Sequence, residues 1–505
     1  MSENSWSEKD GYSIEEACSL LSDKPAVSVD KHSPLASTGC AASTGCGASQ
    51  TCQDTQRDAS VETSVEYRGY SGRRRKAAVL LIVIWSGTIA LHLFSWGFGF
   101  VVGMTAIMSI HAVRVLTAQR LLVPKPLSDE PLCEWPYVSL LVAAKNEEAV
   151  IGRLVQMLCN QDYPSERYEV WVIDDYSTDS TALVLSSMQT KYDQLKVLRR
   201  AANATGGKSG ALNQVLPLTK GEVLAVFDAD AQVKPDMLKR VLPMFQRSQV
   251  GAVQMRKAIA NEGVNFWTRG QSAEMGLDSY FQQQRTAISG IGELRGNGQF
   301  VRREAMYSCG GWNEETITDD LDLTIRLHLN QWDIEFMLEP AVLEEGVTSA
   351  LSLWHQRNRW SEGGYQRYLD YWRLIFSNRM GWRKTWDMFM FWMIQYFLPN
   401  AALPDCLMAI ARNRLPVLSP MTALMLGMSL VAMFTGLRRI SKESGECASL
   451  RKILVTLLQT MRGTLYMLHW LLIVASTAAR ISVRPKRLKW VKTIHQGTGE
   501  ESFEF

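Results

Sequence analysis

Three consecutive segments decide the fold: YVSLLVAA at residues 137–144, EEAVIGRLVQMLCNQ at 147–161 and YEVWVIDD at 168–175. The first and third are short runs rich in β-branched and aliphatic residues, and the second has the apolar spacing of an amphipathic helix. The series continues with GEVLAVFDAD at 221–230 and GAVQM at 251–255. Strands that alternate with helices at this spacing predict βαβ units and a parallel sheet over residues 135–350. Ligands of such sheets bind beyond the carboxyl ends of the strands, so polar residues there are the candidate site residues.

Apolar segments flank this region on both sides. On the N-terminal side, residues 77–113 contain no Asp, Glu, Lys or Arg and follow the basic run GRRRK. A membrane span needs about 20 apolar residues, so we expect a transmembrane hairpin over 72–118 with its break near 95–97. A single tilted helix is the alternative, but it would be roughly 55 Å long. The basic run favours the cytoplasm, and a hairpin would return the next domain to that side through a linker at 119–134.

The chain becomes apolar again after residue 380. We expect interfacial helices over 351–385, transmembrane or interfacial helices over 386–481, and a basic cytoplasmic tail over 482–505. The candidate spans are 386–410, 415–436 and 453–479. Pro399 and Pro404 would kink the first of them. The number of spans stays open, because both RRISK at 438–442 and the basic tail favour the cytoplasm.

The composition of the whole chain limits the remaining classes. Residues 1–71 are rich in small polar and acidic residues and cannot bury enough apolar surface to offset the entropy of ordering, so we expect a disordered tail. The net charge is +3 over 505 residues, which gives no indication of nucleic-acid binding. The nine cysteines show no CxxC spacing, which argues against a zinc site.

Acidic residues follow two of the predicted strands. Asp228 and Asp230 come after VLAVF, and their spacing places both carboxylates on one side of an extended chain. Carboxylate oxygens are the ligands that Mg²⁺ or Mn²⁺ prefers, and such a metal would neutralise a nucleotide diphosphate. Asp174 and Asp175 follow WVI and could accept hydrogen bonds from the base or ribose of a nucleotide. The alternative for this turn is that residues 177–179 only cap the next helix.

Lys208 stands between glycines in GGKSGALN at 206–213. A triphosphate-binding loop would need Gly at position 202, which is Ala, so the sequence excludes a nucleotide triphosphatase of that type. A lysine at the start of a helix still suits a diphosphate, through its charge and through the exposed amides. A plain flexible loop is the alternative.

Three acids are crowded into TDDLD at 318–322, ahead of an amphipathic helix. Like charges this dense are costly unless a cation or a catalytic demand holds them, so one of them could be a general base. An acid-rich helix N-terminus is the alternative.

Gln356, Arg359 and Trp360 have the spacing of one helix face. An arginine there could hold a leaving diphosphate, and a tryptophan could stack on a sugar ring. The alternative is an amphipathic helix that lies on the membrane surface.

Taken in order, these motifs resemble the family 2 glycosyltransferases, a GT-A-fold group that includes cellulose, chitin and hyaluronan synthases and several glycolipid synthases. The resemblance covers about residues 135–380 and rests on DD at 174–175, KSGALN at 208–213, DAD at 228–230, GNGQFVRRE at 296–304, GGWNEETITDDLDL at 310–323 and QRNRW at 356–360. It implies an α/β GT-A nucleotide-sugar-binding domain flanked by transmembrane helices on both sides.

The resemblance also implies a role for each site residue. Asp174 and Asp175 would contact the uridine, and Lys208 would contact the donor phosphates. Asp228 would bind the nucleotide and the metal, and Asp230 would bind the metal. Asp320 would be the general base of an inverting displacement, and the acceptor and the diphosphate would be bound by Gln356, Arg359 and Trp360. Two positions depart from the family pattern. Asp319 stands where the family has Glu, and Val347 stands where many relatives have Pro.

The flanking segments are similar to those of glycolipid synthases of this family. That similarity implies UDP-glucose as donor, 1,2-diacylglycerol as acceptor, Mg²⁺ as cofactor with Mn²⁺ as the alternative, and a downstream epimerase. It also implies a multi-pass membrane protein with a cytoplasmic catalytic domain. A processive β-polysaccharide synthase or another lipid glucosyltransferase remains an alternative, because QxxRW is shared with polymer-forming enzymes. A non-catalytic nucleotide-sugar sensor is disfavoured, because several groups of catalytic type occur together.

Overall fold

The computed structural model describes residues 72–127, 135–445 and 449–484. The expected tail at 1–71, residues 128–134 of the expected linker and residues 485–505 of the expected basic tail lie outside the described residues.

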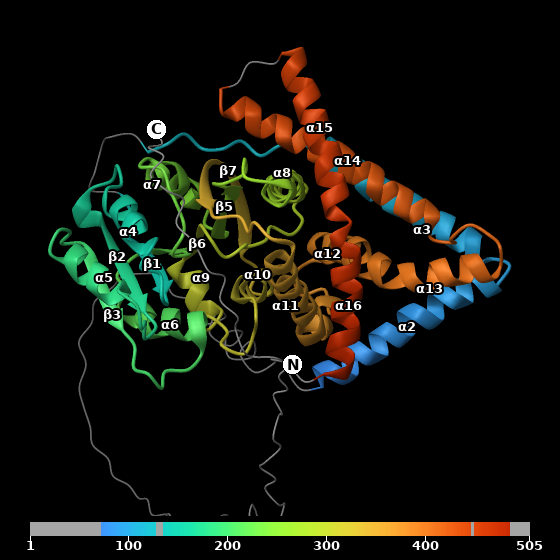
Figure 1. The fold of residues 1–505 in the computed structure, drawn as a ribbon, viewed down its shortest axis with the longest axis horizontal. Helices are drawn as coiled ribbons and strands as arrows, with labels where there is room; N and C mark the ends of the chain where they lie inside the picture. Colours follow the sequence, from blue (N-terminus) through green and yellow to red (C-terminus); the bar gives the residue numbers. More distant parts are fainter. Residues whose placement is uncertain (1–71, 128–134, 446–448, 485–505) are drawn as a thin grey trace, which may run out of the picture. The chain divides into compact units, whose positions relative to one another are not determined.

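An α/β domain forms the middle of the described chain (Figure 1). Its elements are, in chain order, β1 (Val138–Ala144), α4 (Ile151–Cys159), β2 (Tyr168–Asp174), α5 (Thr181–Gln189), β3 (Leu195–Arg199), α6 (Gly207–Val215), β4 (Val223–Phe227), α7 (Met237–Val241), β5 (Val250–Ile259), α8 (Phe266–Ala287), β6 (Gln299–Arg302), α9 (Arg303–Ser308), α10 (Asp319–Leu329) and β7 (Asp333–Glu344). The strands and helices expected over 137–192 are therefore all present.

Seven strands form one sheet in the order β3-β2-β1-β4-β6-β5-β7. Strands β1 to β4 are parallel to one another, as the alternating pattern predicts. Strand β6 runs antiparallel to both β4 and β5, so the prediction of a purely parallel sheet is wrong in this half. The reason is that the chain enters the sheet again at the edge where β4 ends, because Gln299, the first residue of β6, pairs with Val226 near the end of β4. The loop before β6 therefore lies at the carboxyl edge of the parallel strands.

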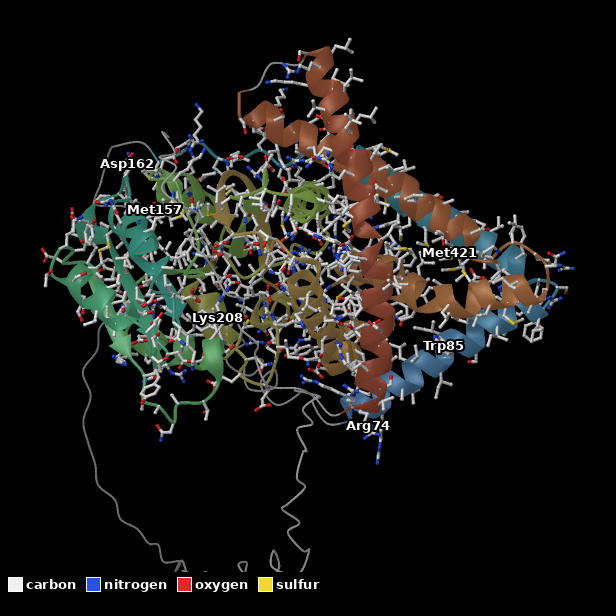
Figure 2. The ribbon with its side chains drawn as sticks, in the orientation of Figure 1. Arg74, Trp85, Met157, Asp162, Lys208 and Met421 are labelled. Atoms are coloured by element: carbon white, nitrogen blue, oxygen red, sulfur yellow. The ribbon has the colours of Figure 1, made fainter. Side chains whose placement is uncertain are left out.

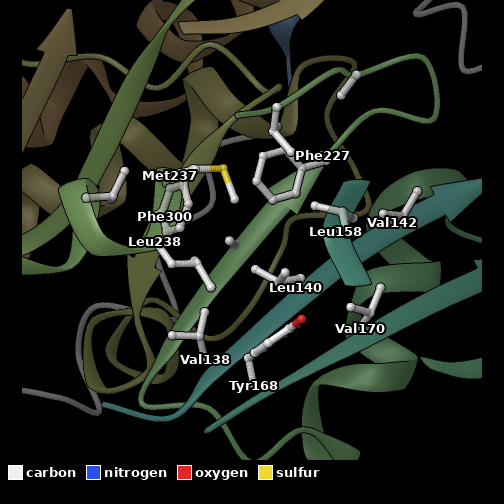
Figure 3. Packing of buried hydrophobic residues seen from close by; sticks show 14 of the residues in the cluster. Val138, Leu140, Val142, Leu158, Tyr168, Val170, Phe227, Met237, Leu238 and Phe300 are labelled. Atoms are coloured by element: carbon white, nitrogen blue, oxygen red, sulfur yellow. The ribbon is translucent and has the colours of Figure 1, made fainter. Parts of the chain in front are cut away.

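Apolar side chains fill both faces of this sheet. Successive side chains along β1 point to opposite faces, so Leu140 packs on one side and Leu141 on the other. The first face is covered by α4, α5 and α7, and Figure 3 shows Leu140 among Leu158, Phe227 and Met237. The second face is covered by α6, α9 and α10. Packing on both faces fixes the ends of β1 and β4, where the candidate site residues follow.

Apolar helices flank the α/β domain in the sequence. They are α2 (Arg73–Leu93) and α3 (Gly97–Thr117) before it, and α11 (Ala350–Phe376), α12 (Trp382–Trp392), a π-helical turn (Met393–Phe397), α13 (Leu398–Ala411), α14 (Ser419–Glu443), α15 (Leu450–Met467) and α16 (His469–Val483) after it. Among the described residues, four segments are long and apolar enough to cross a membrane: α2, α3, α14 and the run 450–483.

One expected span has the predicted form and one does not. The apolar run 77–113 is broken between Leu93 and Gly97, as the hairpin prediction requires, and it is not the single tilted helix that was the alternative. The expected span 386–410 is divided among α12, the π-helical turn and α13, and Pro404 lies inside α13.

Polar contacts and packing join these helices to the α/β domain. Helix α14 packs against α8, and α16 packs against α2 and α11. Arg73 at the start of α2 forms an ion pair with Asp370 of α11. Trp85, labelled in Figure 2, donates its indole N–H to the Asn400 carbonyl of α13 at 3.2 Å. The ion pair of Arg73 joins the basic end of α2 to α11, the helix that follows the α/β domain in the sequence.

Candidate active site

A cavity of about 1420 Å³ lies at the carboxyl edge of β1 and β4. Its walls come from the loop after β4, the start of α6, the start of α10 and the first half of α11. Seven of the nine predicted site residues line it: Lys208, Asp228, Asp230, Asp320, Gln356, Arg359 and Trp360. Residues from four separate sequence motifs thus meet in one place.

Asp174 and Asp175 do not line this cavity. Asp174 is buried, and its Oδ1 accepts a hydrogen bond from the backbone N–H of Ser177 at 2.9 Å, so it closes the turn after β2. Asp175 forms an ion pair with Arg200 at 2.6 Å. Asp174 is the last residue of β2 and Asp175 follows it, and β2 is separated from β4 by β1. Their contact with a uridine stays a prediction.

Lys208 and Asp228 form an ion pair in which Nζ and Oδ1 are 2.5 Å apart. Lys208 belongs to the first turn of α6, and that helix begins after Gly206, whose φ of 82° favours glycine. Burial by itself lowers the pKa of Lys208, but the charges of Asp228 and Asp319 outweigh it, so the pKa lies above its usual range. Lys208 is therefore held as a cation beside the acid that follows β4, where a diphosphate would be bound.

Asp228 and Asp230 are suitable ligands for a hard divalent cation. Asp230 accepts the backbone N–H of Glu345 at 3.1 Å, which orients its carboxylate at the cavity wall. No cluster of three or more His, Cys, Asp or Glu suited to a metal occurs within the described residues. Mg²⁺ usually binds one or two carboxylates together with water and substrate phosphates, so two aspartates beside a diphosphate site fit it.

We call residues 318–320, which are the N-cap and the first two residues of α10, the acidic loop. Burial raises the pKa of Asp320 to about 6, and the neighbouring charge of Asp319 adds to the shift. Asp322 has a different environment, because it is buried and paired with Arg326 at 2.6 Å and with the Tyr371 hydroxyl at 2.9 Å. Of the three acids, Asp319 and Asp320 line the cavity, and Asp322 holds α10 in place.

Close packing of α11 fixes the position of the acidic loop. A Cβ added to Gly363 would lie 2.0 Å from Oγ1 of Thr318 and 2.4 Å from its Cγ2. The adjacent Gly364 is packed against the Tyr396 hydroxyl in the same way. Only glycine allows this approach, so the Gly363–Gly364 pair sets the distance between α11 and the acids.

The QxxRW segment occupies the first half of α11, as its spacing predicts. Arg359 is near both Asp228 and Asp320, since their charges act on it, although burial lowers its pKa. Trp360 carries the guanidinium of Arg357 at 3.9 Å from its ring centre and the Lys257 ammonium at 5.3 Å. Trp360 therefore forms part of the cavity wall, and two cations hold its ring in position.

Two cavity residues were missed by the sequence motifs. Lys257 of β5 forms an ion pair with Glu344 at 2.9 Å, and the basic pair Arg256-Lys257 in a mostly apolar strand was the signal that could have identified it. Glu274 of α8 accepts hydrogen bonds from the fully buried Arg357 at 2.5 Å and from the Trp470 indole at 2.8 Å. It joins the QxxRW helix to α16, and no local pattern marks it.

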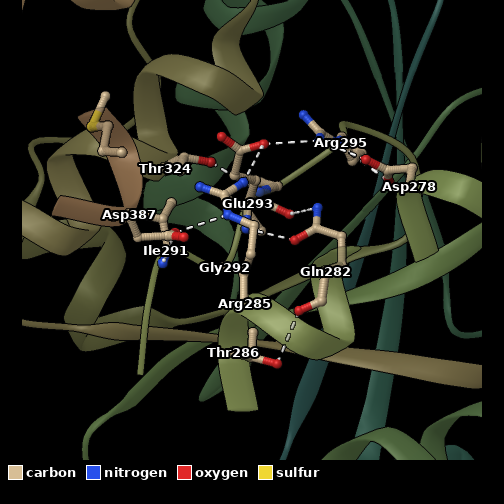
Figure 4. Close-up of polar contacts among 12 residues, drawn as sticks. Asp278, Gln282, Arg285, Thr286, Ile291, Gly292, Glu293, Arg295, Thr324 and Asp387 are labelled. Carbon is tan, nitrogen blue, oxygen red and sulfur yellow. Dashed lines mark hydrogen bonds and ion pairs between the residues drawn. The ribbon is translucent and has the colours of Figure 1, made fainter. Parts of the chain in front are cut away.

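A further buried acid, Glu293, lies in a cluster of arginines (Figure 4). We call Glu293, Arg285, Arg295 and Arg367 the arginine cluster. The carboxylate of Glu293 is 2.7 Å from Arg367 and 2.8 Å from Arg295, and Arg285 also pairs with Asp387 of α12 at 2.8 Å. Burial alone would raise the pKa of Glu293, but the charges of Arg367, Arg295 and Arg285 hold that pKa below its ordinary range.

The other end of the cavity is apolar and is formed by the flanking helices. It includes Phe391 of α12, Ile394 of the π-helical turn, Met425 and Met433 of α14, and Leu471 and Val474 of α16. One continuous space therefore connects charged groups at the sheet edge with apolar walls among candidate membrane helices.

Comparisons with known proteins identify the family. The family model described as "Glycosyltransferase like family 2" matches residues 136–363. The chain is 59% identical to the beta-monoglucosyldiacylglycerol synthase of Nostoc sp. over 501 residues, which cover 99% of this chain and 100% of the relative. It is 55% identical to the protein of the same name from Synechocystis sp. over 439 residues, covering 87% and 91%.

A solved structure, a mannosyltransferase from Pyrobaculum calidifontis in complex with GDP-Man and Mn²⁺, is 20% identical with a TM-score of 0.49, covering 76% of this chain and 99% of that one. The expected GT-A-like domain flanked by apolar helices is confirmed by the family match, the mixed sheet and the four candidate spans. The chain therefore belongs to the family of the beta-monoglucosyldiacylglycerol synthases, within the glycosyltransferases of family 2.

Proposed function

We propose that the protein transfers glucose from UDP-glucose to 1,2-diacylglycerol with inversion, which forms β-monoglucosyldiacylglycerol. The observation that carries the proposal is the continuity of the cavity, from Lys208, Asp228 and Asp320 to apolar side chains of candidate membrane helices. A nucleotide diphosphate needs the charged end, and the acyl chains of a lipid need the apolar end. The name shared by the most similar relatives supports glucose as the sugar and diacylglycerol as the acceptor.

Asp320 is the proposed general base. A pKa of about 6 leaves most of this carboxylate ionised at neutral pH while keeping it basic enough to take a proton. It accepts the proton of the free glycerol hydroxyl, whose oxygen attacks the anomeric carbon from the face opposite the diphosphate. Attack from that face inverts the configuration, so an α-linked donor gives a β-linked product.

The leaving diphosphate is stabilised by positive charge. Lys208 pairs with Asp228, and Arg359 lines the same cavity, so two cationic groups are available to the diphosphate. Asp228 and Asp230 would hold Mg²⁺ or Mn²⁺, which supplies further charge neutralisation to the diphosphate when bound. On this proposal Lys208 exchanges its pairing with Asp228 for contact with a phosphate oxygen.

The catalytic domain is proposed to face the cytoplasm. Four consecutive basic residues, 73–76, begin α2, and basic residues next to a span favour the cytoplasmic side. The ion pair of Arg73 with Asp370 joins this end of α2 to α11, the helix that follows the α/β domain, which supports the same side for both. UDP-sugars are available on that side, and a downstream epimerase would act on the glucolipid product.

A transfer assay tests the proposal. Purified protein in mixed micelles receives labelled UDP-glucose, diacylglycerol and Mg²⁺, with UDP-galactose and ceramide in parallel reactions. The expected product is a single monoglucosyl lipid that is lost on chelation and restored by Mg²⁺ or Mn²⁺. An immobile polymer would instead support a processive synthase, and a product only with ceramide would support another lipid glucosyltransferase.

A further inference from the structure

The apolar end of the cavity opens at the level of the candidate membrane helices. Leu426 of α14 and Leu471 of α16 both line the cavity, and both are also exposed, by 44% and 38%. Their helices belong to segments that are long and apolar enough to cross a membrane. Exposed leucines at the mouth of a cavity would be in contact with lipid chains there, so a lipid could enter sideways without leaving the bilayer.

A polar side chain interrupts this apolar wall. Gln395 lines the cavity, and its Oε1 is buried without a hydrogen-bond partner among the described residues. It lies in the π-helical turn between α12 and α13, and such turns occur frequently at functional sites. A ligand that accepts a hydrogen bond from the NH₂ group of this amide would recover part of the cost of burying it.

The position of Gln395 connects the two ends of the cavity. Its neighbour Ile394 belongs to the apolar wall, and its other neighbour Tyr396 is packed against Gly364 of α11. The adjacent Gly363 is packed against Thr318 at the start of the acidic loop. Gln395 therefore lies next to the apolar wall on one side. On the other side, Tyr396 and α11 connect it to the acidic loop that contains the proposed base.

We propose that the apolar end of the cavity holds the acyl chains of the acceptor, and that the Gln395 amide donates a hydrogen bond to one of its ester carbonyl oxygens. The assignment rests on the proposed function and adds the position of the acceptor to it. Diacylglycerol has one hydroxyl, which must face Asp320, so only its two ester carbonyls remain for Gln395. An ester carbonyl oxygen can only accept a hydrogen bond, so the NH₂ group of the Gln395 amide is the donor in this contact.

The test compares 1,2-dioleoylglycerol with its 1,2-dioleyl ether, which has the same chains and hydroxyl but no carbonyls. The wild-type protein should prefer the ester by about 3–10-fold in kcat/KM, the range expected for one neutral hydrogen bond. Gln395→Met should reduce this preference to about one by lowering the rate with the ester alone. Gln459→Met is the matched control, because Gln459 is on α15 and does not line the cavity, and it should keep the wild-type ratio.

Each outcome decides between the two proposals. An ester-over-ether ratio that is unchanged in Gln395→Met, or a wild-type ratio of one, overturns the role of Gln395. Glucose transfer by the wild type to neither lipid overturns the proposed function instead. If Gln395→Met does not fold, Gln395→Glu replaces the donor by an oxygen at the same length and should also remove the ester preference, and retention of that preference would overturn the role.

The acyl-chain part of the proposal has a separate test. Leu471→Trp should lower the rate with dioleoylglycerol by about tenfold while changing the rate with dioctanoylglycerol about twofold or less, because the larger side chain fills space used by long chains. Leu407→Trp is the control, since Leu407 is exposed on α13 and does not line the cavity. Equal losses with both chain lengths in Leu471→Trp would overturn the assignment of the acyl chains to this end.

Discussion

The acidic loop and the arginine cluster both hold acids away from water, but their electrostatics are opposite. Burial and Asp319 raise the pKa of Asp320 to about 6, and no ion pair within the described part of the chain neutralises it. Three arginines keep the pKa of Glu293 low, and they lie between α8, α11 and α12. A buried acid whose pKa is raised can exchange a proton near neutral pH, whereas one surrounded by cations serves to connect helices. The comparison predicts which acid is needed for turnover and which for folding.

The largest effect is expected from Asp320→Asn. Loss of the general base should reduce kcat by about 10²–10⁴-fold, while the affinity for UDP stays close to the wild-type value. Folding should not suffer, because ionised Asp320 is disfavoured by burial and the amide removes that cost. Labelled glucose transfer, UDP titration and thermal melting in detergent measure the three quantities. A variant with full activity would show that Asp320 is not the base.

Glu293→Gln should lower the stability of the fold more than the rate of transfer, which is the opposite of Asp320→Asn. Removing one partner of a buried charge cluster leaves arginines without compensation, so the free energy of unfolding should fall by about 3–5 kcal/mol. The rate per folded molecule should change far less than in Asp320→Asn, because Glu293 itself does not line the cavity, although its partners Arg285, Arg295 and Arg367 do. Asp236→Asn is the control, since its pair with Arg240 is on the surface and should contribute about 1 kcal/mol or less. A loss of kcat without a loss of melting temperature would contradict the distinction between the two regions.

Much of the fold could be predicted, because β1, β2 and β4 are aliphatic runs with turn residues at their ends. The reversed β6 could not, since a strand of four residues is too short to have a recognisable period. The ordered motifs and the family resemblance predicted one shared site for four residues. The structure has all four in one cavity: Lys208, Asp228, Asp320 and Arg359.

The arginine cluster and Gln395 had no local signal. Glu293 and Arg367 are 74 residues apart in the sequence, and their pairing depends on how α11 packs on the loop before β6. Asp174 and Asp175 end a strand that is not adjacent to β4, a relation that only the strand order reveals. Pairings between distant elements are the part that a single sequence does not contain.

Gly363→Ala tests whether the acidic loop depends on close helix packing. The added methyl would be 2.0 Å from Oγ1 of Thr318, so the loop or α11 must move. A displacement of about 1 Å in a catalytic group can cost about 10²-fold in rate, and we expect a loss of that order in kcat. Gly427→Ala on α14 is the matched control, because nothing lies within 4 Å of the added methyl. Activity equal to the wild type in Gly363→Ala would show that the loop tolerates the shift.

The smallest effect, and the most direct comparison of the two acids, is the dependence of the rate on pH. The base must be ionised to accept a proton, so kcat/KM should rise with pH through the pKa of Asp320, which is about 6, and level off above it. Below that value the rate should fall about tenfold for each pH unit. The lowered pKa of Glu293 keeps it ionised over this range, and protonation of the buried Asp320 removes the cost of its charge, so the melting temperature should stay constant or rise slightly while the activity falls. Measuring both between pH 5 and 8 separates the two regions in one experiment. A melting temperature that fell together with the activity would mean that the acid limb reports unfolding rather than protonation of Asp320.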